Sequence, residues 1–336
     1  MAKIAINGFG RIGRSALKAG WHKEGFEVVA INDLTDAVTL AYLLKHDTNY
    51  GLWDVPVSAE GNALIIGGKK IALFAEKDPA ALPWKKLGID IVIESTGLFT
   101  TQEKAEGHIK AGAKGVVLSA PAKGGDVPTY VRGVNCSGIK DDRHKVINNA
   151  SCTTNCVAPV TAVMEEAFGI EKAIMTTVHG YTASQALVDS PKKDLREGRA
   201  AAENIIPTST GAAIAVTETI PQLKEKFDGL SVRVPIPTVS LSDMTFVLKR
   251  DVTIDEVNDA LVKASQTSRF SGILGVSFEP LVSSDYIGDE RSAIVDAELT
   301  NVVGGNLVKV VAWYDNEWGY SHRLAEVVLM AAARSL

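Results

Sequence analysis

Hydrophobic residues in the first 150 positions alternate between short β-branched runs and amphipathic segments. The β-branched runs predict strands, and they are Lys3–Asn7, Glu27–Asp33, residues 89–96 and residues 115–119. The amphipathic segments predict the helices that lie between these strands, and they are Arg11–His22, Asp36–Lys45 and a stretch around residues 101–111. Strands that alternate with helices in this way are typical of parallel α/β structure.

A less regular stretch interrupts this alternation between residues 50 and 88. Glycine and proline break it repeatedly, at Gly51, Gly61, Gly67, Gly68, Pro79 and Pro83. Because breaks at this spacing leave room only for short elements, the stretch is predicted to hold short antiparallel strands.

The pattern changes from about Ser151. A predicted helix, Cys152–Phe168, is followed by longer alternating strands over residues 173–180, 229–237, 240–250, 293–299 and 306–315. Two further helices are predicted, Val252–Gln266 and Asn316–Ser335. Residues 180–208 are rich in glycine and charge and have no period, and an irregular loop of this length inside a compact domain is usually functional or disordered.

Length and composition narrow the class of protein. The chain has 336 residues, and at ~150 residues per domain this predicts two domains. The motifs and the change of pattern at Ser151 place the boundary near residue 150. With 46% hydrophobic and 22% charged residues, a disordered or fibrous chain is excluded. The formal net charge of −5 argues against a nucleic acid as the primary partner, since phosphate binding needs a basic face.

The number of cysteines and the lengths of the apolar runs indicate where in the cell the protein is expected to be located. Three cysteines, Cys136, Cys152 and Cys156, are too few for a disulfide framework and indicate a reducing environment. The first apolar run is broken at Asn7 and Gly8, so no secretory signal is expected. No stretch approaches the ~18 apolar residues of a membrane span. A cytoplasmic location, with no membrane partner and no metal, is predicted.

A glycine motif lies directly between the first strand and the first helix. Gly8, Gly10 and Gly13 have the G-x-G-x-x-G spacing, which allows a tight turn and lets backbone N–H groups approach a pyrophosphate. Asp33 follows 20 residues after Gly13, where a carboxylate can bind the ribose 2′-hydroxyl and repel a 2′-phosphate. The motif therefore predicts NAD. The alternative, glycines of an ordinary turn and Asp33 as a helix cap, does not explain the spacing.

Two residues suggest nucleophilic catalysis. Cys152 begins a predicted helix, where unpaired N–H groups and the helix dipole favour a thiolate. By itself, a buried structural cysteine is an equally good explanation, and Cys156, one turn further on, is interpreted as such. His179 ends a strand before an irregular loop, a place from which a base can reach the thiol.

Hydroxyl groups and arginines are scattered through the second half, and together they suggest binding of an anionic substrate. They are Thr182, Arg199, Thr208, Ser209, Thr210, Gly211 and Arg233. Each alone is more often a solvated side chain or a helix cap.

NAD and a nucleophilic cysteine together point to aldehyde oxidation. Addition of a thiolate to an aldehyde makes a tetrahedral hemithioacetal that can release hydride and leave a thioester. His179 would accept the proton during addition and return it later. Two anion sites would then serve a substrate phosphate and an attacking phosphate.

At this point the chain resembles the phosphorylating, NAD-dependent glyceraldehyde-3-phosphate dehydrogenases over essentially its whole length. The matching segments are INGFGRIGR (6–14), ESTG (94–97), SAP (119–121), NASCTTNC (149–156), HGYT (179–182), PTSTGAA (207–213), RVPIPTVS (233–240) and YDNEWGYS (314–321). The segment around Cys152 is highly specific to this family.

The resemblance implies roles for individual residues. It makes Cys152 the nucleophile and His179 its base. It implies that the cofactor is bound by Gly8, Gly10, Arg11, Ile12, Gly13, Asp33, Lys77, Ser119 and Asn316. It implies that the substrate phosphate is bound by Thr182 and Arg233, and inorganic phosphate by Ser151, Thr153, Thr210 and Gly211 with Arg199 nearby.

The resemblance also implies an architecture and a reaction. We expect a Rossmann-type NAD-binding domain with a parallel sheet over residues 1–150, and an α+β catalytic domain with a mostly antiparallel sheet over residues 151–315. The C-terminal helix, residues 316–336, is expected to pack back on the first domain. The family is homotetrameric, with the 180–208 loop at subunit and cofactor contacts. Its members oxidise and phosphorylate D-glyceraldehyde 3-phosphate to 1,3-bisphosphoglycerate in glycolysis and gluconeogenesis.

The sequence leaves alternatives open for the cofactor, the substrate and the class of function. Ser190 precedes Pro191 where bacterial relatives often carry leucine, which weakens the preference for NAD, although Asp33 outweighs it. A related enzyme that oxidises erythrose 4-phosphate shares the cysteine segment but departs from the family at HGYT and PTSTG, which are intact here. A non-catalytic binding protein on the same fold would not require the complete catalytic set.

Overall fold

The computed structural model describes residues 1–335 and divides into two compact units. The first unit comprises Met1–Tyr130, Cys136–Ala150 and the chain from Ser321 onward, and the second comprises Val131–Asn135 and Ser151–Tyr320. Two short segments, residues 131–135 and 316–320, therefore belong to the second unit rather than to the first as the predicted bounds have it.

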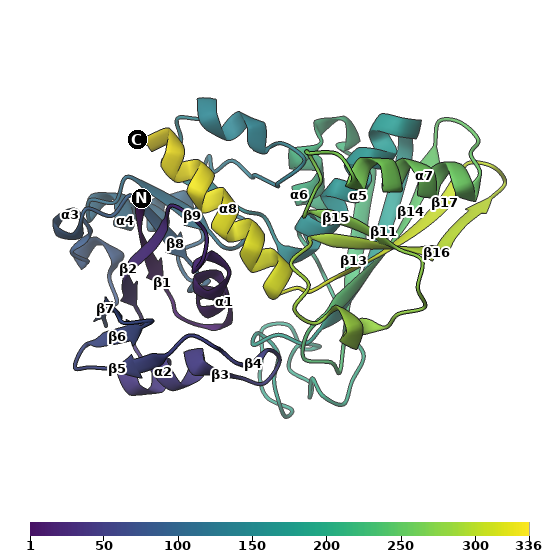
Figure 1. Cartoon of the computed structure of the whole chain (residues 1–336). Helices are drawn as coiled ribbons and strands as arrows, with labels where there is room; N and C mark the ends of the chain where they lie inside the picture. Colours follow the sequence, from purple (N-terminus) through teal and green to yellow (C-terminus); the bar gives the residue numbers. More distant parts are fainter. Residues whose placement is uncertain (336) are drawn as a thin grey trace. The chain divides into compact units, whose positions relative to one another are not determined.

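The first unit is built on an eight-stranded sheet in the order β10-β9-β8-β1-β2-β7-β6-β5 (Figure 1). Its six parallel strands are β1 (Ala2–Asn7), β2 (Phe26–Asn32), β7 (Lys69–Phe74), β8 (Ile91–Glu94), β9 (Gly115–Leu118) and β10 (Val146–Asn148). Antiparallel pairing extends it through β6 (Ala63–Ile66) and β5 (Val57–Ala59). The predicted parallel α/β sheet is confirmed, and so are short antiparallel strands between residues 50 and 88.

The helices of this unit follow the strands as the apolar pattern predicts. They are α1 (Arg11–Gly20), α2 (Ala37–Lys45), the short α3 (Trp84–Leu87), α4 (Gln102–Lys110) and α8 (Trp318–Ser335), with a small hairpin of β3 (His46–Asp47) and β4 (Gly51–Leu52). Strands β8 and β9 are buried at every residue, as strands covered on both faces are. In α8, Leu324, Val327 and Val328 are fully buried, which explains the apolar face of this helix.

The order of the parallel strands reverses direction between β1 and β8. From β1 the chain adds β2 and then β7 on one side, and β8, β9 and β10 on the other. This is the doubly wound arrangement in which ligands bind at the carboxyl ends of the strands, next to the point of reversal.

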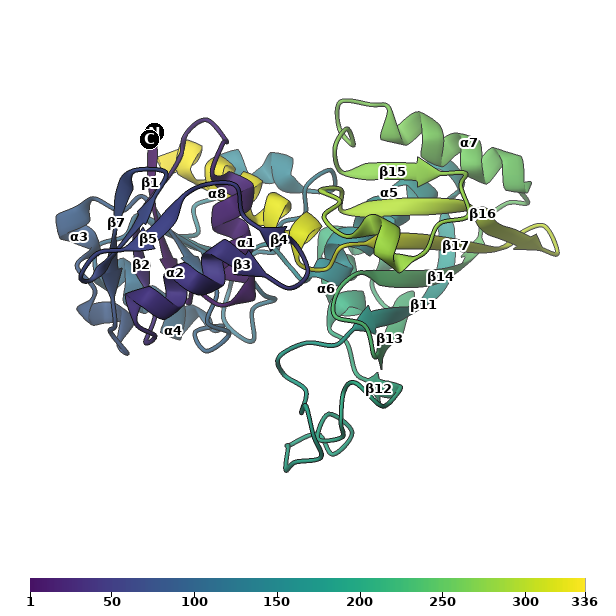
Figure 2. The ribbon, with the colours of Figure 1, turned by 60° about the horizontal axis from the view of Figure 1, so that its bottom comes forward.

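The second unit contains a seven-stranded sheet in the order β12-β13-β11-β14-β17-β16-β15 (Figure 2). Its strands are β11 (Ile170–Gly180), β12 (Ile206–Thr208), β13 (Phe227–Val234), β14 (Ser240–Leu248), β15 (Leu274–Ser277), β16 (Ala293–Val303) and β17 (Leu307–Tyr314). Only the β11–β13 and β15–β16 pairs are parallel, so the expected mostly antiparallel sheet is confirmed. Helices α5 (Cys152–Phe168), α6 (Ala212–Thr219) and α7 (Ile254–Ser265) pack against it.

Residues 181–205 form the predicted irregular loop, which projects from the sheet before β12 (Figure 2). Helix α6 was not predicted. Ala212, Ala213, Ala215 and Val216 form one buried face, but the apolar Ile214 is exposed and the polar Thr219 is buried, so the hydropathy pattern does not mark the helix. No helix among residues 1–335 is long and apolar enough to cross a membrane.

Candidate active site

The glycine turn joins β1 to α1 in the first unit. Gly8 has a φ of +88°, and a Cβ placed on it would lie 2.7 Å from the backbone nitrogen of Thr96. A Cβ on Gly13 would collide with the carbonyl oxygen of Gly8, whereas the space beside Gly10 is open. Gly10 is also the N-cap of α1 and offers no side chain to its first N–H groups. An open turn at a helix start, with no side chain to cap the first N–H groups, fits the pyrophosphate of NAD.

Asp33 lies directly after β2 and is bound to this turn. One carboxylate oxygen, Oδ2, accepts a hydrogen bond of 2.7 Å from the backbone N–H of Phe9, and Oδ1 accepts one of 2.9 Å from Thr35. The carboxylate is half-buried, so it keeps a surface for a ligand. This position fits the adenosine ribose of NAD, as the spacing from Gly13 predicts.

Lys77 and Ser119 lie at the same edge of the sheet as the turn. Lys77 follows β7, and the segment before it is held by Asn32, which exchanges two hydrogen bonds of 2.8 Å with the backbone of Glu76. Ser119 follows β9, and its N–H donates to the carbonyl oxygen of Glu94. The first-unit residues assigned to the cofactor thus lie beyond the carboxyl ends of parallel strands or, like Arg11, Ile12 and Gly13, in the first turn of α1.

Cys152 is the first residue of α5 in the second unit, as predicted. Ser151 is the N-cap, and its Oγ accepts a hydrogen bond of 3.0 Å from the N–H of Thr154. The Sγ atom of Cys152 lies 3.4 Å from Nε2 of His179, the penultimate residue of β11. The fold therefore places together a thiol and an imidazole that are 27 positions apart in the sequence.

The ring of His179 is oriented by contacts to its other nitrogen. Nδ1 lies 2.7 Å from the carbonyl oxygen of Gly180, which can only accept, and 2.6 Å from Nη1 of Arg233, which can only donate. These two contacts fix the orientation of the ring, with Nε2 toward the thiol, and not its tautomer. Burial, and then the positive charge of Arg233, lower the pKa of His179 to about 3, so the imidazole is neutral at pH 7.

The pKa of Cys152 results from two opposing effects, burial and the start of the helix. Burial raises the pKa of the Cys152 thiol above its ordinary value, while the charge of Arg233 and hydrogen bonds at the start of α5 oppose this shift. A neutral thiol beside a neutral base is therefore the resting arrangement. The helix start therefore acts in the expected direction, and desolvation, which depends on everything packed around the sulfur, outweighs it.

Tyr314 was not singled out from the sequence, although it belongs to the YDNEWGYS segment. Its hydroxyl lies 2.9 Å from Oγ1 of Thr153 and 2.9 Å from Oγ1 of Thr177. These bonds connect the first turn of α5 to β11, the strand that carries His179. Tyr314 thus helps to hold the thiol and the imidazole at a fixed separation.

Asn316 follows β17 and is buried beside the catalytic strand. Its Oδ1 accepts a hydrogen bond of 3.0 Å from Ser240, whose Oγ accepts one of 3.2 Å from the N–H of Gly180. Val239, just before Ser240, has a φ of +68°, which is rare for a β-branched residue. A strained backbone conformation of this kind persists only where the surrounding contacts stabilise it, and such positions are often found at functional sites.

Arg233 is a cation without an anionic partner. Among the described residues it forms no ion pair, and its buried Nε has no hydrogen-bond acceptor. Strand β13 places it opposite His179 on one side and opposite Ile206 of β12 on the other. A guanidinium with unused donors beside the thiol–imidazole pair suits an anionic substrate.

The remaining predicted residues are engaged in local contacts. Thr182 Oγ1 lies 3.1 Å from Ser184 Oγ, and Arg199 forms an exposed ion pair of 3.1 Å with Asp189 inside the 181–205 loop. Thr210 Oγ1 accepts from the N–H of Ala212, and Gly211 is the N-cap of α6. No hydrogen bond within residues 1–335 joins Thr182, Arg199 or Thr210 to Cys152 or His179.

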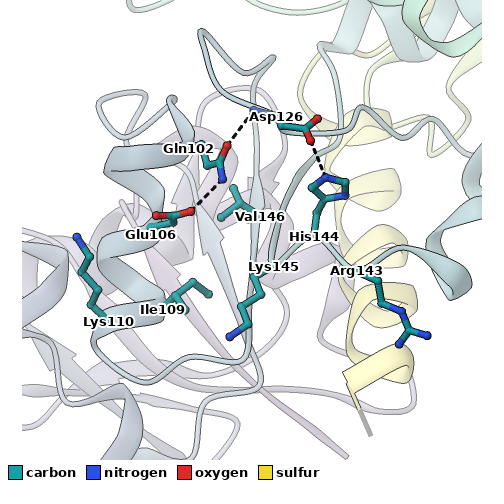
Figure 3. Close-up of a pocket in the computed structure, with 9 residues that line it drawn as sticks. All are labelled: Gln102, Glu106, Ile109, Lys110, Asp126, Arg143, His144, Lys145 and Val146. Carbon is teal, nitrogen blue, oxygen red and sulfur yellow. Dashed lines mark hydrogen bonds and ion pairs between the residues drawn. The ribbon is translucent and has the colours of Figure 1, made fainter.

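A pocket of about 410 Å³ lies elsewhere in the first unit, between α4 and β10 (Figure 3). Asp126 lies at the rim of the pocket. Its carboxylate contacts Nε2 of His144, and its backbone N–H donates to Oε1 of Gln102. None of the predicted site residues lines this pocket. Among residues 1–335, no cluster of three or more side chains could hold a metal ion.

Comparisons with known proteins agree across the whole chain. The family model described as "Glyceraldehyde 3-phosphate dehydrogenase, NAD binding domain" matches residues 2–102, and the corresponding C-terminal domain model matches residues 151–316. The chain is 53% identical over 334 residues to glyceraldehyde-3-phosphate dehydrogenase of Geobacillus stearothermophilus, covering 99% of each protein. It is 52% identical over 332 residues to glyceraldehyde-3-phosphate dehydrogenase 2 of Bacillus subtilis, covering 99% of this chain and 97% of the relative.

Proposed function

The chain belongs to the glyceraldehyde-3-phosphate dehydrogenase family and is an NAD-dependent dehydrogenase, and we propose that it converts D-glyceraldehyde 3-phosphate and inorganic phosphate to 1,3-bisphosphoglycerate. The observation that carries this proposal is the 3.4 Å contact between the Cys152 sulfur and a neutral His179 imidazole. A glycolytic or gluconeogenic role follows from this reaction.

The first step is addition of Cys152 to the aldehyde. The sulfur forms a bond to the carbonyl carbon, the C=O π electrons move to oxygen, and the thiol proton moves to Nε2 of His179, giving a hemithioacetal as its oxyanion. This transfer needs a base that is free of its proton at neutral pH, and a pKa of about 3 in the resting site keeps His179 in that form. Bound NAD supplies the hydride acceptor, and loss of hydride from the hemithioacetal carbon leaves a thioester on Cys152.

The second step releases the product. A phosphate oxygen attacks the thioester carbon, the bond to sulfur breaks, and the sulfur leaves as a thiol after receiving a proton from His179. The raised pKa of Cys152 in the buried site favours this reprotonation. The same imidazole therefore serves as base and then as acid.

Two phosphate sites are part of the proposal. Arg233 and Thr182 bind the phosphate of the substrate, and the unpaired guanidinium of Arg233 supports this role. Ser151, Thr153, Thr210 and Gly211 bind inorganic phosphate, with Arg199 nearby. Hydroxyls and backbone N–H groups at the starts of α5 and α6 support this assignment.

The cofactor residues are likewise proposed individually. Gly8, Gly10, Arg11, Ile12 and Gly13 receive the pyrophosphate. Asp33 binds the ribose and favours NAD over NADP, Lys77 and Ser119 line the cofactor cleft, and Asn316 orients the nicotinamide carboxamide.

We propose a homotetramer located in the cytoplasm. Large apolar side chains on the second unit are exposed: Ile174 is 61% exposed on β11 and Leu230 is 45% exposed on β13. The 181–205 loop exposes Leu187, Val188 and Leu195 as well. Burial between subunits would remove this apolar surface from water. Three free cysteines suit a reducing compartment.

The reaction is tested by following NADH formation with D-glyceraldehyde 3-phosphate, with inorganic phosphate present and then omitted. We expect turnover that depends on phosphate. Cys152→Ser should abolish turnover while leaving the Kd for NAD unchanged. A preference for erythrose 4-phosphate without phosphate would favour the alternative dehydrogenase, and activity in Cys152→Ser would exclude the covalent mechanism.

A further inference from the structure

A carboxylate is buried at the carboxyl end of β8, next to the glycine turn. Glu94 is the last residue of β8, and its side chain is 1% exposed. It pairs across the strands with Asn7, the last residue of β1, so it lies where the strand order reverses. A charged group is expensive to bury unless its oxygens are hydrogen-bonded, so its partners show what it does there.

Four donors surround the two oxygens of Glu94. Oε1 accepts from the N–H of Thr96 at 2.8 Å and from its Oγ1 at 2.5 Å. Oε2 accepts from Nδ2 of Asn7 at 2.6 Å and lies 3.1 Å from Nε2 of His108 on α4. The carboxylate therefore connects β1, α4 and the turn that follows β8.

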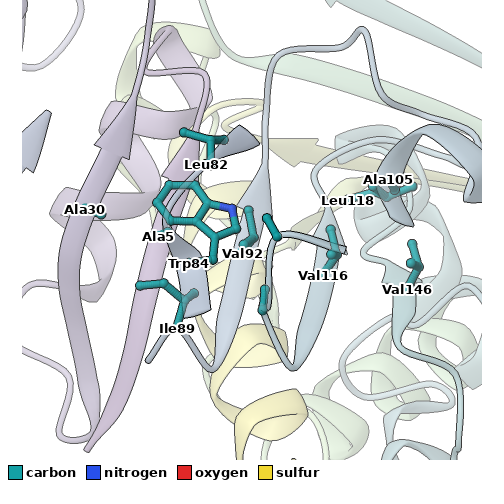
Figure 4. Packing of buried hydrophobic residues seen from close by; sticks show 12 residues of the cluster. Ala5, Ala30, Leu82, Trp84, Ile89, Val92, Ala105, Val116, Leu118 and Val146 are labelled. Atoms are coloured by element: carbon teal, nitrogen blue, oxygen red, sulfur yellow. The ribbon is translucent and has the colours of Figure 1, made fainter. Parts of the chain in front are cut away.

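Trp84 determines how His108 takes part. The indole Nε1, which can only donate, lies 3.0 Å from Nδ1 of His108, so the ring accepts there and donates from Nε2 to Glu94. Both side chains are fully buried, and Figure 4 shows Trp84 among the apolar residues of the core, including Ile89 and Val92. The donor to Glu94 is thus held in place by core packing.

Thr96 transmits the position of Glu94 to the glycine turn. A Cβ on Gly8 would lie 2.7 Å from the nitrogen and 2.8 Å from Cγ2 of Thr96, so Thr96 forms one wall of the turn. The neighbouring Ser95 donates from Oγ to the carbonyl oxygen of Gly8 at 2.7 Å. Moving the backbone at Thr96 would therefore move the turn.

Asn7 extends the network in the other direction. Its Oδ1 accepts a hydrogen bond of 2.7 Å from Asn32, the last residue of β2, which in turn binds the backbone of Glu76. One connected set of buried hydrogen bonds thus runs from α4 across the ends of β8, β1 and β2 to the residue before Lys77.

We propose that Glu94 is a positioning residue for NAD, which shapes the glycine turn and the segment before Lys77 ahead of cofactor binding. The inference rests on the cofactor role proposed for the turn, and it is independent of the phosphate-dependent chemistry. Glutamine does not replace Glu94. Its amide group would face a donor whichever way it is turned, Thr96 on one side or Asn7 and His108 on the other.

The test compares Glu94→Gln with Asp90→Asn. Asp90 is a matched control because it precedes the first residue of the same strand, is also buried, and accepts from the N–H of Lys3 and pairs with Lys114, each at 2.8 Å. Both variants remove one buried negative charge from β8 or the residue before it. Only Glu94 lies at the carboxyl end of the strand, next to the glycine turn. Calorimetric titration of folded protein should show the Kd for NAD raised about tenfold in Glu94→Gln and unchanged in Asp90→Asn.

Two further measurements distinguish positioning from general destabilisation. ADP-ribose, which contains the pyrophosphate but no nicotinamide, should lose the same factor in Glu94→Gln, because the turn is what has moved. The rate at which iodoacetamide alkylates Cys152 in the NAD-free protein should stay the same, because the thiol is in the other unit. Equal changes in Kd for Glu94→Gln and Asp90→Asn would overturn the proposal.

Asp33→Ala separates failure of this inference from failure of the cofactor assignment. If Asp33→Ala weakens NAD binding and Glu94→Gln does not, Glu94 has no positioning role but the turn is still the cofactor site. If neither variant weakens binding, the cofactor site itself is misplaced and the inference falls with it. Should Glu94→Gln fail to fold, Thr96→Val removes the hydroxyl that donates to Glu94 and accepts from the N–H of Leu98, and an unchanged Kd instead of a rise of about threefold would overturn the proposal.

Discussion

At the scale of single residues, burial and one arginine determine the chemistry of the thiol–imidazole pair. Burial disfavours the charged form of each group, and Arg233 lowers the pKa of both, so Cys152 holds its proton while His179 is free to accept one. The pair is thus arranged to move a proton during the reaction rather than to hold separated charges beforehand. Tyr314 supports this arrangement by bonding Thr153 and Thr177.

Selective alkylation tests the reactivity of Cys152. We expect iodoacetamide near neutral pH to modify Cys152 much faster than Cys136 or Cys156, since both of these are buried, whereas Cys152 is partly exposed and has His179 beside it to accept its proton. Peptide mapping by mass spectrometry over time gives the three rates. His179→Asn should slow the modification of Cys152 alone, and equal rates for all three cysteines would contradict activation by His179.

The lowered pKa of His179 predicts a dependence of stability on pH. In the folded protein the pKa is about 3, below its ordinary value of 6.5, so at pH values between the two only the unfolded chain binds the proton. Stability linked to His179 is fully present above pH 6.5 and is lost as the pH falls toward 3, at most about 1.4 kcal/mol per pH unit. Urea unfolding at pH 7 and pH 5 should show a larger loss for the wild type than for His179→Asn. A parallel loss in both would contradict the shift.

At the scale of elements, side-chain caps mark four helix starts, and their absence helps to explain why one helix was missed. Asp36, Thr101, Ser151 and Thr253 each cap a helix through a side-chain oxygen, a signal that is legible in the sequence. Helix α6 has Gly211 as N-cap and no capping side chain, and its exposed face carries the apolar Ile214. The sequence therefore shows neither a cap nor a clear contrast between an apolar and a polar face.

The capping box of α7 gives a prediction that is independent of activity. Thr253 Oγ1 accepts from the N–H of Glu256, whose carboxylate accepts from the N–H of Thr253. Thr253→Ala should lower the free energy of unfolding by about 1 kcal/mol while kcat stays the same. Asp259→Ala, at an exposed position within the same helix, is the control and should not destabilise. Equal effects of the two substitutions on chemical denaturation would argue against the cap.

At the scale of the whole molecule, the predicted functions are divided between two compact units. The glycine turn, Asp33 and the Glu94 network belong to the first unit, and Cys152, His179 and Arg233 belong to the second. The cofactor-shaping network and the thiol–imidazole pair can therefore be perturbed separately. The exposed apolar side chains of the second unit are the surface that we expect to be buried between subunits.

Light scattering after size exclusion tests the proposed tetramer. We expect a mass of about four times the 35.7 kDa of one chain. Ile174→Lys places a charge on an exposed apolar face of the sheet and should shift the protein toward smaller species, since a buried unpaired charge opposes association. A monomeric wild type would contradict the proposal, and a variant tetramer as stable as the wild type would exclude this face as an interface.

The sequence by itself determined the features that depend on neighbouring residues: the strand and helix order, the glycine turn with Asp33 after the second strand, and Cys152 at a helix start. These follow from backbone conformation and apolar periodicity, which are local. Only the tertiary structure decided which distant side chains meet, because strand register and core packing bring His179 to Cys152, Arg233 to His179, and His108 to Glu94. It also decided how far the helix start can lower the pKa of Cys152, because desolvation depends on all the atoms packed around the sulfur.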